Sequence, residues 1–185
     1  ELTALLGELA DDRRKNPKDD LTTALVTAEP GEDVLTPEEL APFFILLAVA
    51  GNDTTRNAIS YGVHFLSENP DQAAIWKNDF DGVAGTAIEE IVRMASPVTF
   101  IRRTAAVDAE VSGHQFPAGE KVVMLYGSAN RDPREFENPE KFDVLRTPNN
   151  HVGFGGPGPH FCLGAHLARR ELNVVFRSLF ERLPD

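Results

Sequence analysis

Apolar residues recur with a helical period along most of the chain, and this periodicity predicts its main elements. The first such segment ends before Asn16-Pro17, because proline disfavours continuation of a helix. A loop is expected at residues 29–33, where Pro30 and Gly31 stand together. The pattern predicts helices at residues 2–14, 21–26, 40–66, 71–77, 83–95 and 163–183.

The longest of these segments has the clearest start signal. Thr36 can cap the helix, Pro37 suits its first position, and Glu39 completes a capping box. The pattern then continues without a break to about Leu66, and Pro70 follows soon after. The middle of the segment is apolar on all sides, which predicts burial between other elements.

From residue 96 the pattern changes to short runs of β-branched and apolar residues, which is typical of strands. Strands are expected at 99–101, 105–107, 110–111 and 122–125, with a hairpin turn at 117–120. Residues 130–159 are rich in proline, glycine and asparagine, so little regular structure is expected, and long irregular segments are commonly functional. The predicted fold is mainly α with small β-sheets around one long central helix.

Composition narrows the possible functions. The 185 residues suffice for one domain with a buried core, and their formal net charge is −11. Phosphate binding needs clustered cations, so nucleic acid is excluded as the main partner. No apolar run reaches the ~20 residues of a membrane span, and no signal-peptide pattern is found. A single cysteine cannot form an internal disulfide, and these features together predict a cytoplasmic protein.

That cysteine, Cys162, follows a glycine-rich stretch and precedes the last predicted helix. Glycines let a backbone approach another group closely, and a helix N-terminus stabilises a thiolate, which is a ligand of haem iron. One alternative is a phosphate-binding loop with an incidental cysteine, although the Gly-Lys-Ser/Thr ending is missing. Another is a zinc site made by His160, Cys162 and His166. Its fourth ligand would be His151 or a carboxylate.

The middle of the long predicted helix carries a second candidate pattern, Ala-Gly-Asn-Asp-Thr at residues 50–54. The two small residues thin the helix there. A buried acid beside a hydroxyl group, as in Asp53 and Thr54, can relay protons. A packing contact at Gly51 beside a solvated Asp-Thr pair is the structural alternative.

Glu90 and Arg93 lie three residues apart on a predicted helix and can pair. Together and in this order, these patterns resemble the cytochrome P450 family over essentially the whole chain. Residues 160–164 and the glycines before them look like its haem-binding loop, 50–54 like its oxygen-activation motif, Glu90 and Arg93 like its Glu-x-x-Arg pair, and 129–143 like its meander. The resemblance implies that residues 1–185 form a single partial domain, the C-terminal part of that fold.

The resemblance also implies a role for each motif residue. Cys162 would bind the haem iron, and Asp53 and Thr54 would deliver protons during oxygen activation. Arg103 and His160 would hold the haem propionates, because buried carboxylates need cationic or hydrogen-bonding partners. The residues implied to contact haem or substrate are Leu46, Ala50, Thr99, Phe154, Gly156 and Gly164.

One departure from the family pattern concerns the Glu90–Arg93 pair. Many relatives carry an arginine at the position of Lys141, and there it joins the pair. Either Arg146 takes that part in this chain or the brace is weaker.

The activity implied is that of a haem-thiolate monooxygenase that hydroxylates an apolar C–H bond with O2. Its electrons would come from a ferredoxin or a similar donor. Residues 43–47 and 153–156 look closest to bacterial hydroxylases of sterol side chains and methyl-branched lipids. The N-terminal half of the family's fold is expected to be missing. A second hypothesis is therefore an inactive or merely haem-binding fragment that forms homo-oligomers through exposed apolar surface.

Overall fold

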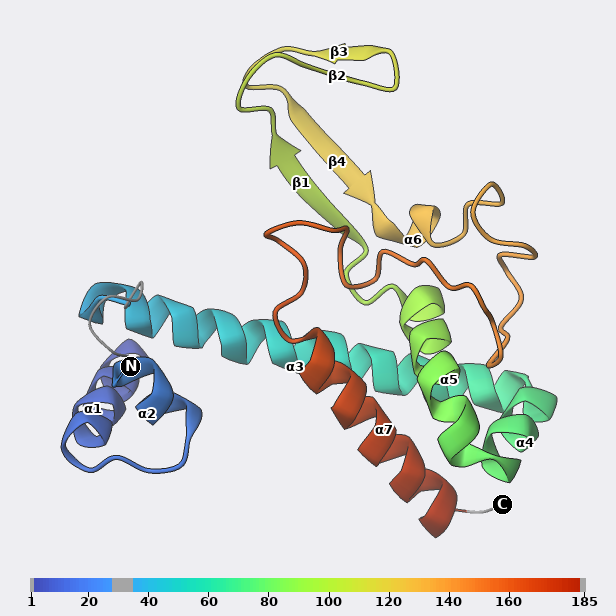
Figure 1. Ribbon diagram of the computed structural model, residues 1–185, viewed down its shortest axis with the longest axis horizontal. Helices are drawn as coiled ribbons and strands as arrows, with labels where there is room; N and C mark the ends of the chain where they lie inside the picture. Colours follow the sequence, from blue (N-terminus) through green and yellow to red (C-terminus); the bar gives the residue numbers. More distant parts are fainter. Residues whose placement is uncertain (1, 28–34, 184–185) are drawn as a thin grey trace. The chain divides into compact units, whose positions relative to one another are not determined.

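Helices dominate the structure, a computed structural model that describes residues 2–27 and 35–183 (Figure 1). The helices are α1 (Leu2–Lys15), α2 (Leu21–Val26), α3 (Pro37–Glu68), α4 (Pro70–Asn78), α5 (Phe80–Ala95), α6 (Tyr126–Ala129) and α7 (Ala165–Arg182). The strands are β1 (Phe100–Thr104), β2 (Ala109–Val111), β3 (His114–Phe116) and β4 (Lys121–Leu125). The predicted fold class, mainly α with small β-sheets, is confirmed. The loop predicted at residues 29–33 lies outside the described residues.

Helix α3 begins at the predicted capping box. The Thr36 N–H donates to Glu39 Oε2 at 2.9 Å, and the Glu39 N–H donates to Thr36 Oγ1 at 3.3 Å. At the other end, Asn69 Nδ2 donates to the Phe65 carbonyl at 2.8 Å, and Pro70 starts α4. Between these ends α3 is one continuous helix, so the predicted start and length are confirmed.

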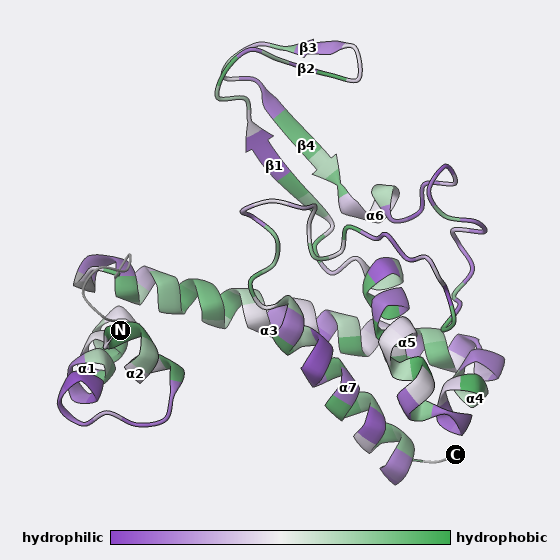
Figure 2. Cartoon of the chain, viewed as in Figure 1, coloured by the Kyte–Doolittle hydropathy of each residue, from purple (hydrophilic) through white to green (hydrophobic). Residues whose placement is uncertain are grey.

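The predicted burial of the middle of α3 is wrong for this chain. Leu46 is 61% exposed and Val49 is 65% exposed, and Figure 2 shows hydrophobic residues on this part of the helix. Leu40 and Ala41 are buried near the start of α3, and Ala58 and Leu66 are buried further along, where other helices pack on it. An all-round apolar pattern leads to burial only where neighbouring elements cover the helix.

The strands form two separate antiparallel ribbons. In the first, β1 pairs with β4, with Phe100 opposite Leu125; in the second, β2 pairs with β3. The strand predicted at 105–107 is wrong, because the β1–β4 ladder ends at Thr104. The Ala105 N–H still donates to the Glu120 carbonyl at 2.9 Å, and the chain then bends into the second ribbon.

The hydrophobic core is built around α5. Ile91 of α5 is 0% exposed, and Leu172 and Phe176 of α7 are each 1% exposed. The Trp76 ring of α4 lies 5.1 Å from the Phe176 ring, centroid to centroid. A Cβ placed on Gly62 of α3 would come within 2.5 Å of Phe176 Cζ, so α3 approaches α7 closely there. This packing fixes α5 and α7, the two helices that hold the candidate site.

The chain divides into two compact units, residues 1–53 and residues 54–185. The hydrophobic core belongs to the second unit. Within the described ranges, no helix has both the length and the apolar character that crossing a membrane requires.

Candidate functional site

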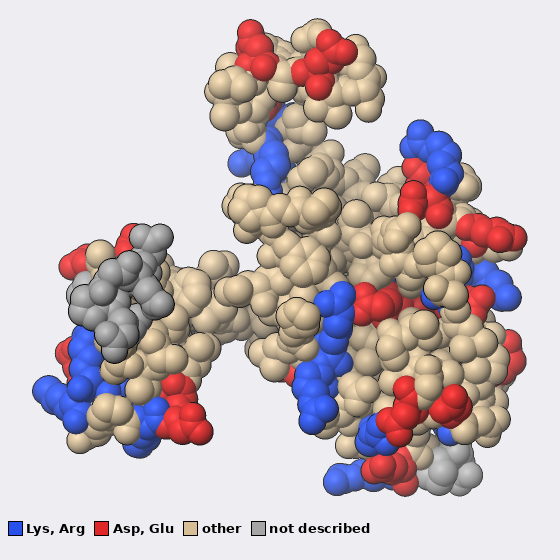
Figure 3. All heavy atoms as spheres, viewed as in Figure 1, with Lys and Arg blue, Asp and Glu red and all other residues tan. Residues whose placement is uncertain are grey.

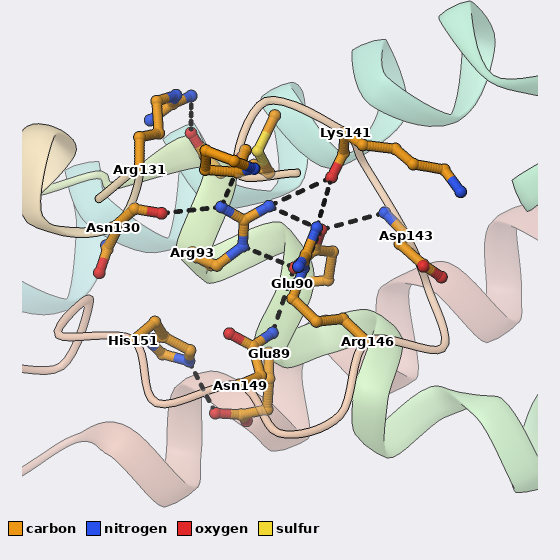
Figure 4. Close-up of polar contacts among 12 residues, drawn as sticks. Glu89, Glu90, Arg93, Asn130, Arg131, Lys141, Asp143, Arg146, Asn149 and His151 are labelled. Carbon is orange, nitrogen blue, oxygen red and sulfur yellow. Dashed lines mark hydrogen bonds and ion pairs between the residues drawn. The ribbon is translucent and has the colours of Figure 1, made fainter. Parts of the chain in front are cut away.

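A buried ion pair on α5 anchors the irregular segment that follows the ribbons (Figure 4). The side chains of Glu90 and Arg93 are both 0% exposed. Arg93 Nε donates to Glu90 Oε2 and Arg93 Nη2 donates to Glu90 Oε1, each at 2.8 Å. Arg93 Nη1 reaches the backbone carbonyls of Asn130 at 2.7 Å and Pro139 at 2.8 Å. Since bidentate pairs demand strict geometry, Arg93 fixes the path of this segment.

Arg146 joins the same carboxylate. Its Nε donates to both Glu90 oxygens, at 3.1 Å and 3.0 Å. Lys141 takes part only through its backbone carbonyl, which accepts from Arg93 Nη2 at 3.3 Å and from Arg146 Nη2 at 2.9 Å. The Asp143 N–H adds a further bond to Glu90 Oε1 at 3.0 Å. Two arginines therefore share one buried carboxylate, although position 141 carries a lysine.

Asn130 connects this brace to the cysteine loop, residues 151–164. Asn130 is 0% exposed. Its Nδ2 donates to Ser96 Oγ at 2.9 Å, and its Oδ1 accepts from the Val152 N–H at 2.8 Å. Ser96 is the left-handed C-cap of α5, with φ of 39°. The cysteine loop thus starts from a point tied to the end of α5.

Two glycines allow the cysteine loop to fold against α5. A Cβ on Gly153 would lie 2.6 Å from Val92 Cγ1, so a larger residue would push the loop away. Gly155 has φ of 88°, in the left-handed region that favours glycine. The Cys162 N–H then donates to the Phe154 carbonyl at 2.9 Å. This hydrogen bond closes the loop and holds the cysteine backbone beside Phe154.

The Cys162 side chain lies at the surface. The Cys162 backbone carbonyl accepts from the Ala165 N–H at 3.2 Å, where α7 begins. The exposed apolar side chains next to it in the chain are Phe161, Leu163 and Leu167, at 43%, 77% and 62% exposure. A Cβ on Gly156 or Gly164 would meet no other described atom within 4 Å. A soft sulfur ligand, exposed apolar side chains and open glycine faces fit a large, flat cofactor such as haem.

A second polar cluster beside the loop was not predicted. Glu89 of α5 accepts from Arg169 Nε at 2.5 Å, from Arg169 Nη2 at 2.9 Å and from His151 Nε2 at 2.9 Å. Burial would raise the pKa of Glu89, but the hydrogen bonds from Arg169 and His151 outweigh it and lower the pKa to about 2. The Arg169 guanidinium lies over the Phe154 ring at 4.5 Å. The sequence signals were indirect: Glu89 precedes Glu90, and Arg169 lies on the helix after Cys162.

The residues expected on the oxygen side lie within α3. Leu46, Ala50 and Thr54 follow one another at four-residue spacing, so they share a face of the helix. Leu46, Ala50 and Asp53 are exposed, and Thr54 is half-buried. The division of the chain into two compact units falls between Asp53 and Thr54. A role for these residues in oxygen activation stays a prediction.

Outside α3, the expected propionate and pocket residues Arg103, Thr99 and His160 are exposed, whereas Phe154 is half-buried. Arg103 lies on β1, and its Nη1 donates to the Arg102 carbonyl at 3.3 Å. The Thr99 carbonyl accepts from the Tyr126 N–H at 3.0 Å, at the start of α6. His160 lies in the cysteine loop. Their contacts with haem stay predictions.

The zinc interpretation is not supported. In the described part of the chain, no three His, Cys, Asp or Glu side chains gather into a group that could hold a metal ion. Cys162 also precedes the first residue of α7, so it does not share a helical face with His166 as that interpretation required.

The chain is similar to known proteins. A family model of cytochrome P450 matches residues 6–183. A methyl-branched lipid omega-hydroxylase of Mycobacterium tuberculosis is 55% identical over 185 residues, which are 100% of this chain and 43% of that protein. A steroid C26-monooxygenase of Rhodococcus jostii is 50% identical, with 100% and 39% covered.

The structural comparison agrees with the sequence comparison. The cytochrome P450 CYP268A2 of Mycobacterium marinum, solved in complex with pseudoionone, is 54% identical and superposes with a TM-score of 0.93. That match covers 100% of this chain and 44% of the other. The chain thus spans less than half the length of each of these three proteins.

Proposed function

This chain belongs to the cytochrome P450 family, and from that premise we propose that it contributes the haem-ligand side of a monooxygenase acting on an apolar, lipid- or sterol-like substrate. Its relatives are named monooxygenases and hydroxylases. Haem, when bound, would supply O2 activation and transfer of one oxygen atom to a C–H bond. The protein would supply the sulfur ligand, the pocket and the protons.

The observation that carries the proposal is the setting of Cys162. Its backbone is fixed by the hydrogen bond to Phe154, while its side chain is exposed. Apolar side chains that would be costly to leave in water surround it in the sequence. This combination suits a sulfur that binds the iron of a large apolar cofactor better than it suits a packing cysteine, which is normally buried.

The other roles in the proposal follow the family motifs. Arg103 and His160 would neutralise and hydrogen-bond the haem propionates. Asp53 and Thr54 would hold and pass protons on the oxygen side. The side chains proposed to contact haem or substrate are Leu46, Ala50, Thr99 and Phe154, with Gly156 and Gly164 leaving room for the ring.

The substrate class rests on the relatives. One acts, by its name, on methyl-branched lipids and another on steroids, and both substrates are large and apolar. We propose a substrate of that kind, O2 as co-substrate and a ferredoxin-like electron donor. The cytoplasm is the proposed setting.

The test is the absorption spectrum of the ferrous protein with CO. We expect the red-shifted Soret band of a thiolate-bound haem, and we expect Cys162→Ser to abolish it. The matched control is His166→Gln, which removes a nearby candidate metal ligand and should leave the band in place. A band that persists in Cys162→Ser would refute the ligand assignment. Zinc in place of iron in metal analysis would do the same.

A second candidate function is favoured by the coverage of the relatives. The chain corresponds to 43% of a relative's length, and Leu46 and Val49 of α3 are largely exposed. A fragment with half a pocket would bind haem without turnover or would self-associate. Haem stoichiometry and oligomeric state distinguish this candidate from an active enzyme.

A further inference from the structure

Asn130 lies between the buried ion pair of α5 and the start of the cysteine loop, and it is 0% exposed (Figure 4). Its backbone carbonyl accepts from Arg93 Nη1 at 2.7 Å, and its backbone N–H donates to the Tyr126 carbonyl at 2.9 Å. These two hydrogen bonds fix the backbone of Asn130, so its side chain extends from a defined position.

The side-chain amide of Asn130 has one orientation that satisfies its neighbours. The Val152 N–H can only donate, and it lies 2.8 Å from Oδ1, so the amide oxygen faces the cysteine loop. The Nδ2 group then donates to Ser96 Oγ at 2.9 Å, and the Ser96 hydroxyl donates in turn to the Arg93 carbonyl at 2.8 Å. This directed series of hydrogen bonds ties Val152 to the end of α5.

From Val152, two backbone hydrogen bonds lead to the cysteine. The Val152 carbonyl accepts from the Gly155 N–H at 2.8 Å. The Phe154 carbonyl accepts from the Cys162 N–H at 2.9 Å. Both acceptors lie within the first four residues of the cysteine loop, so the position of Val152 determines where the cysteine backbone lies.

We propose that Asn130 is a positioning residue for Cys162: its amide holds the start of the cysteine loop against the end of α5, and the loop in turn places the sulfur. The amide suits this role because it accepts one hydrogen bond and donates another at the same time. For the iron-bound sulfur the inference rests on the proposed function. For the loop itself it stands on the hydrogen bonds alone.

Two substitutions release the loop to different extents. Asn130→Ala removes the acceptor of the Val152 N–H, which is the larger loss. Ser96→Gly removes only the hydroxyl that orients the amide, and glycine suits the φ of 39° at this position. Ser96→Gly should therefore loosen the loop with little loss of overall stability. It decides the question alone if Asn130→Ala does not fold.

Gln72 of α4 provides a matched control. It is buried, at 6% exposure, and its Oε1 accepts from the Val144 N–H at 3.0 Å. This bond is of the same kind, from a backbone N–H of the irregular segment to a buried side-chain amide oxygen, but Val144 lies outside the cysteine loop. Gln72→Ala should lower overall stability by a similar amount and leave the loop in place.

The experiment measures hydrogen exchange by mass spectrometry in the purified chain, without added haem. It compares the loop amides of Gly155 and Cys162 with the core amides of Leu172 and Phe176, two residues of α7 that are each 1% exposed. A loss of overall stability speeds exchange of the core amides at least as much as that of the loop amides. Local release of the loop speeds the loop amides more.

We expect Asn130→Ala to raise the ratio of loop to core exchange rates about ten- to hundredfold, because the Val152 N–H loses its acceptor. Ser96→Gly should raise the ratio less, because the amide oxygen is still present. Gln72→Ala should not raise it, although a buried hydrogen bond is lost there too.

Salt separates this role from that of the surface charges. Figure 3 shows cationic and carboxylate atoms side by side over α7 and its surroundings, and Arg177 of α7 pairs with Asp81 of α5. Salt at roughly 1 M screens exposed charges, whereas the side-chain hydrogen bonds of Asn130 join neutral groups that are buried or partly buried. The rise in the ratio should therefore persist in this salt. A rise that salt abolishes would overturn the inference.

The haem-loaded form gives a second measurement. We expect Asn130→Ala to lose part of the red-shifted Soret band of the ferrous protein with CO, because the sulfur of a displaced loop does not reach the iron in every chain. Gln72→Ala should keep the parent band. An unchanged band in Asn130→Ala would overturn the placement of the sulfur by Asn130.

The two measurements distinguish this inference from the proposed function. A ratio that rises equally in Gln72→Ala, or that does not rise in Asn130→Ala and Ser96→Gly, overturns the inference even where the red-shifted band shows a thiolate-bound haem. If the chain binds no haem but the ratio rises as expected, the proposed function fails and the positioning of the loop by Asn130 stands.

Discussion

Two arginines converge on the single carboxylate of Glu90, which is 0% exposed. Burying a charge costs several kcal/mol unless partners replace the lost water. Here Arg93, Arg146 and the Asp143 N–H provide those partners. The stability of this cluster therefore depends on the exact positions of these groups. Removing the Glu90 carboxylate leaves two cations without their common counter-ion.

We therefore expect Glu90→Gln to lower the free energy of unfolding by about 3–5 kcal/mol, measured by urea unfolding. The control is Glu140→Gln, which removes an exposed partner of Arg131 at 3.2 Å and should cost less than about 1 kcal/mol. Equal losses in the two variants would contradict the assignment of Glu90 as the central brace.

The Glu89 carboxylate predicts a pH dependence of stability. Its pKa falls from an ordinary 4.5 to about 2 in the folded chain, because hydrogen bonds from Arg169 and His151 outweigh burial. The stabilisation is therefore fully present above pH 4.5 and is lost as the pH falls toward 2. A shift of this size corresponds to about 3 kcal/mol at most, and partial exposure of the carboxylate reduces it to about 1–2 kcal/mol.

Urea unfolding of the parent and Glu89→Gln at pH 6 and pH 3 checks this dependence. The free energy of unfolding of the parent should exceed that of Glu89→Gln, and this difference should be about 1 kcal/mol smaller at pH 3 than at pH 6. A difference that stays constant or grows on acidification would show that Glu89 is not held ionised by its partners.

At the scale of elements, local signals predicted the helices other than the short α6, because caps and periodicity lie within one segment. The box at Thr36 and Glu39 is an example. The β2–β3 hairpin was not predicted in full, although Ser112 and Gly113, with φ of 52° and 81°, form its two-residue turn. The burial of α3 could not be predicted, since burial depends on neighbours that the local pattern does not describe.

Close packing of α3 against α5 and α7 makes Gly62 sensitive to substitution. A Cβ there would lie 2.5 Å from Phe176 Cζ and 2.9 Å from Ile91 Cδ1, both in the core. We expect Gly62→Ala to lower the free energy of unfolding by about 1–3 kcal/mol, although alanine is the better helix former. A Cβ on Gly85 of α5 would have no neighbour within 4 Å. Gly85→Ala should therefore raise the free energy of unfolding by about 0.5–1 kcal/mol.

Thermal or urea unfolding of the two alanine variants measures both effects. Stabilisation by Gly62→Ala would mean that α3 does not approach Phe176 as closely as the structure has it. Because both substitutions are Gly→Ala within helices, their difference isolates the packing term from helix propensity.

At the scale of the whole molecule, the candidate site contains two kinds of residue. Some belong to sequence motifs, and others are brought together only by the fold. Cys162, Glu90 and Arg93 belong to motifs that carry their own spacing, so the sequence identified them. Glu89 and Arg169 meet only because α5 packs beside α7, and this contact joins residues 80 positions apart. Contacts of this kind leave no local pattern, which is why the cluster behind the cysteine loop was not predicted.

The exposed part of α3 predicts how the whole chain behaves in solution. Leu46 and Val49 are 61% and 65% exposed, and apolar surface of this kind favours association with a second copy. We expect sedimentation velocity to show concentration-dependent self-association, and we expect Leu46→Gln combined with Val49→Gln to shift it toward monomer. The control is Val107→Gln with Val111→Gln, which removes comparable exposed valines, 69% and 59%, from the β2–β3 region. A parent chain that stays monomeric and holds one haem would contradict the fragment hypothesis, because α3 would then need no second copy to cover it.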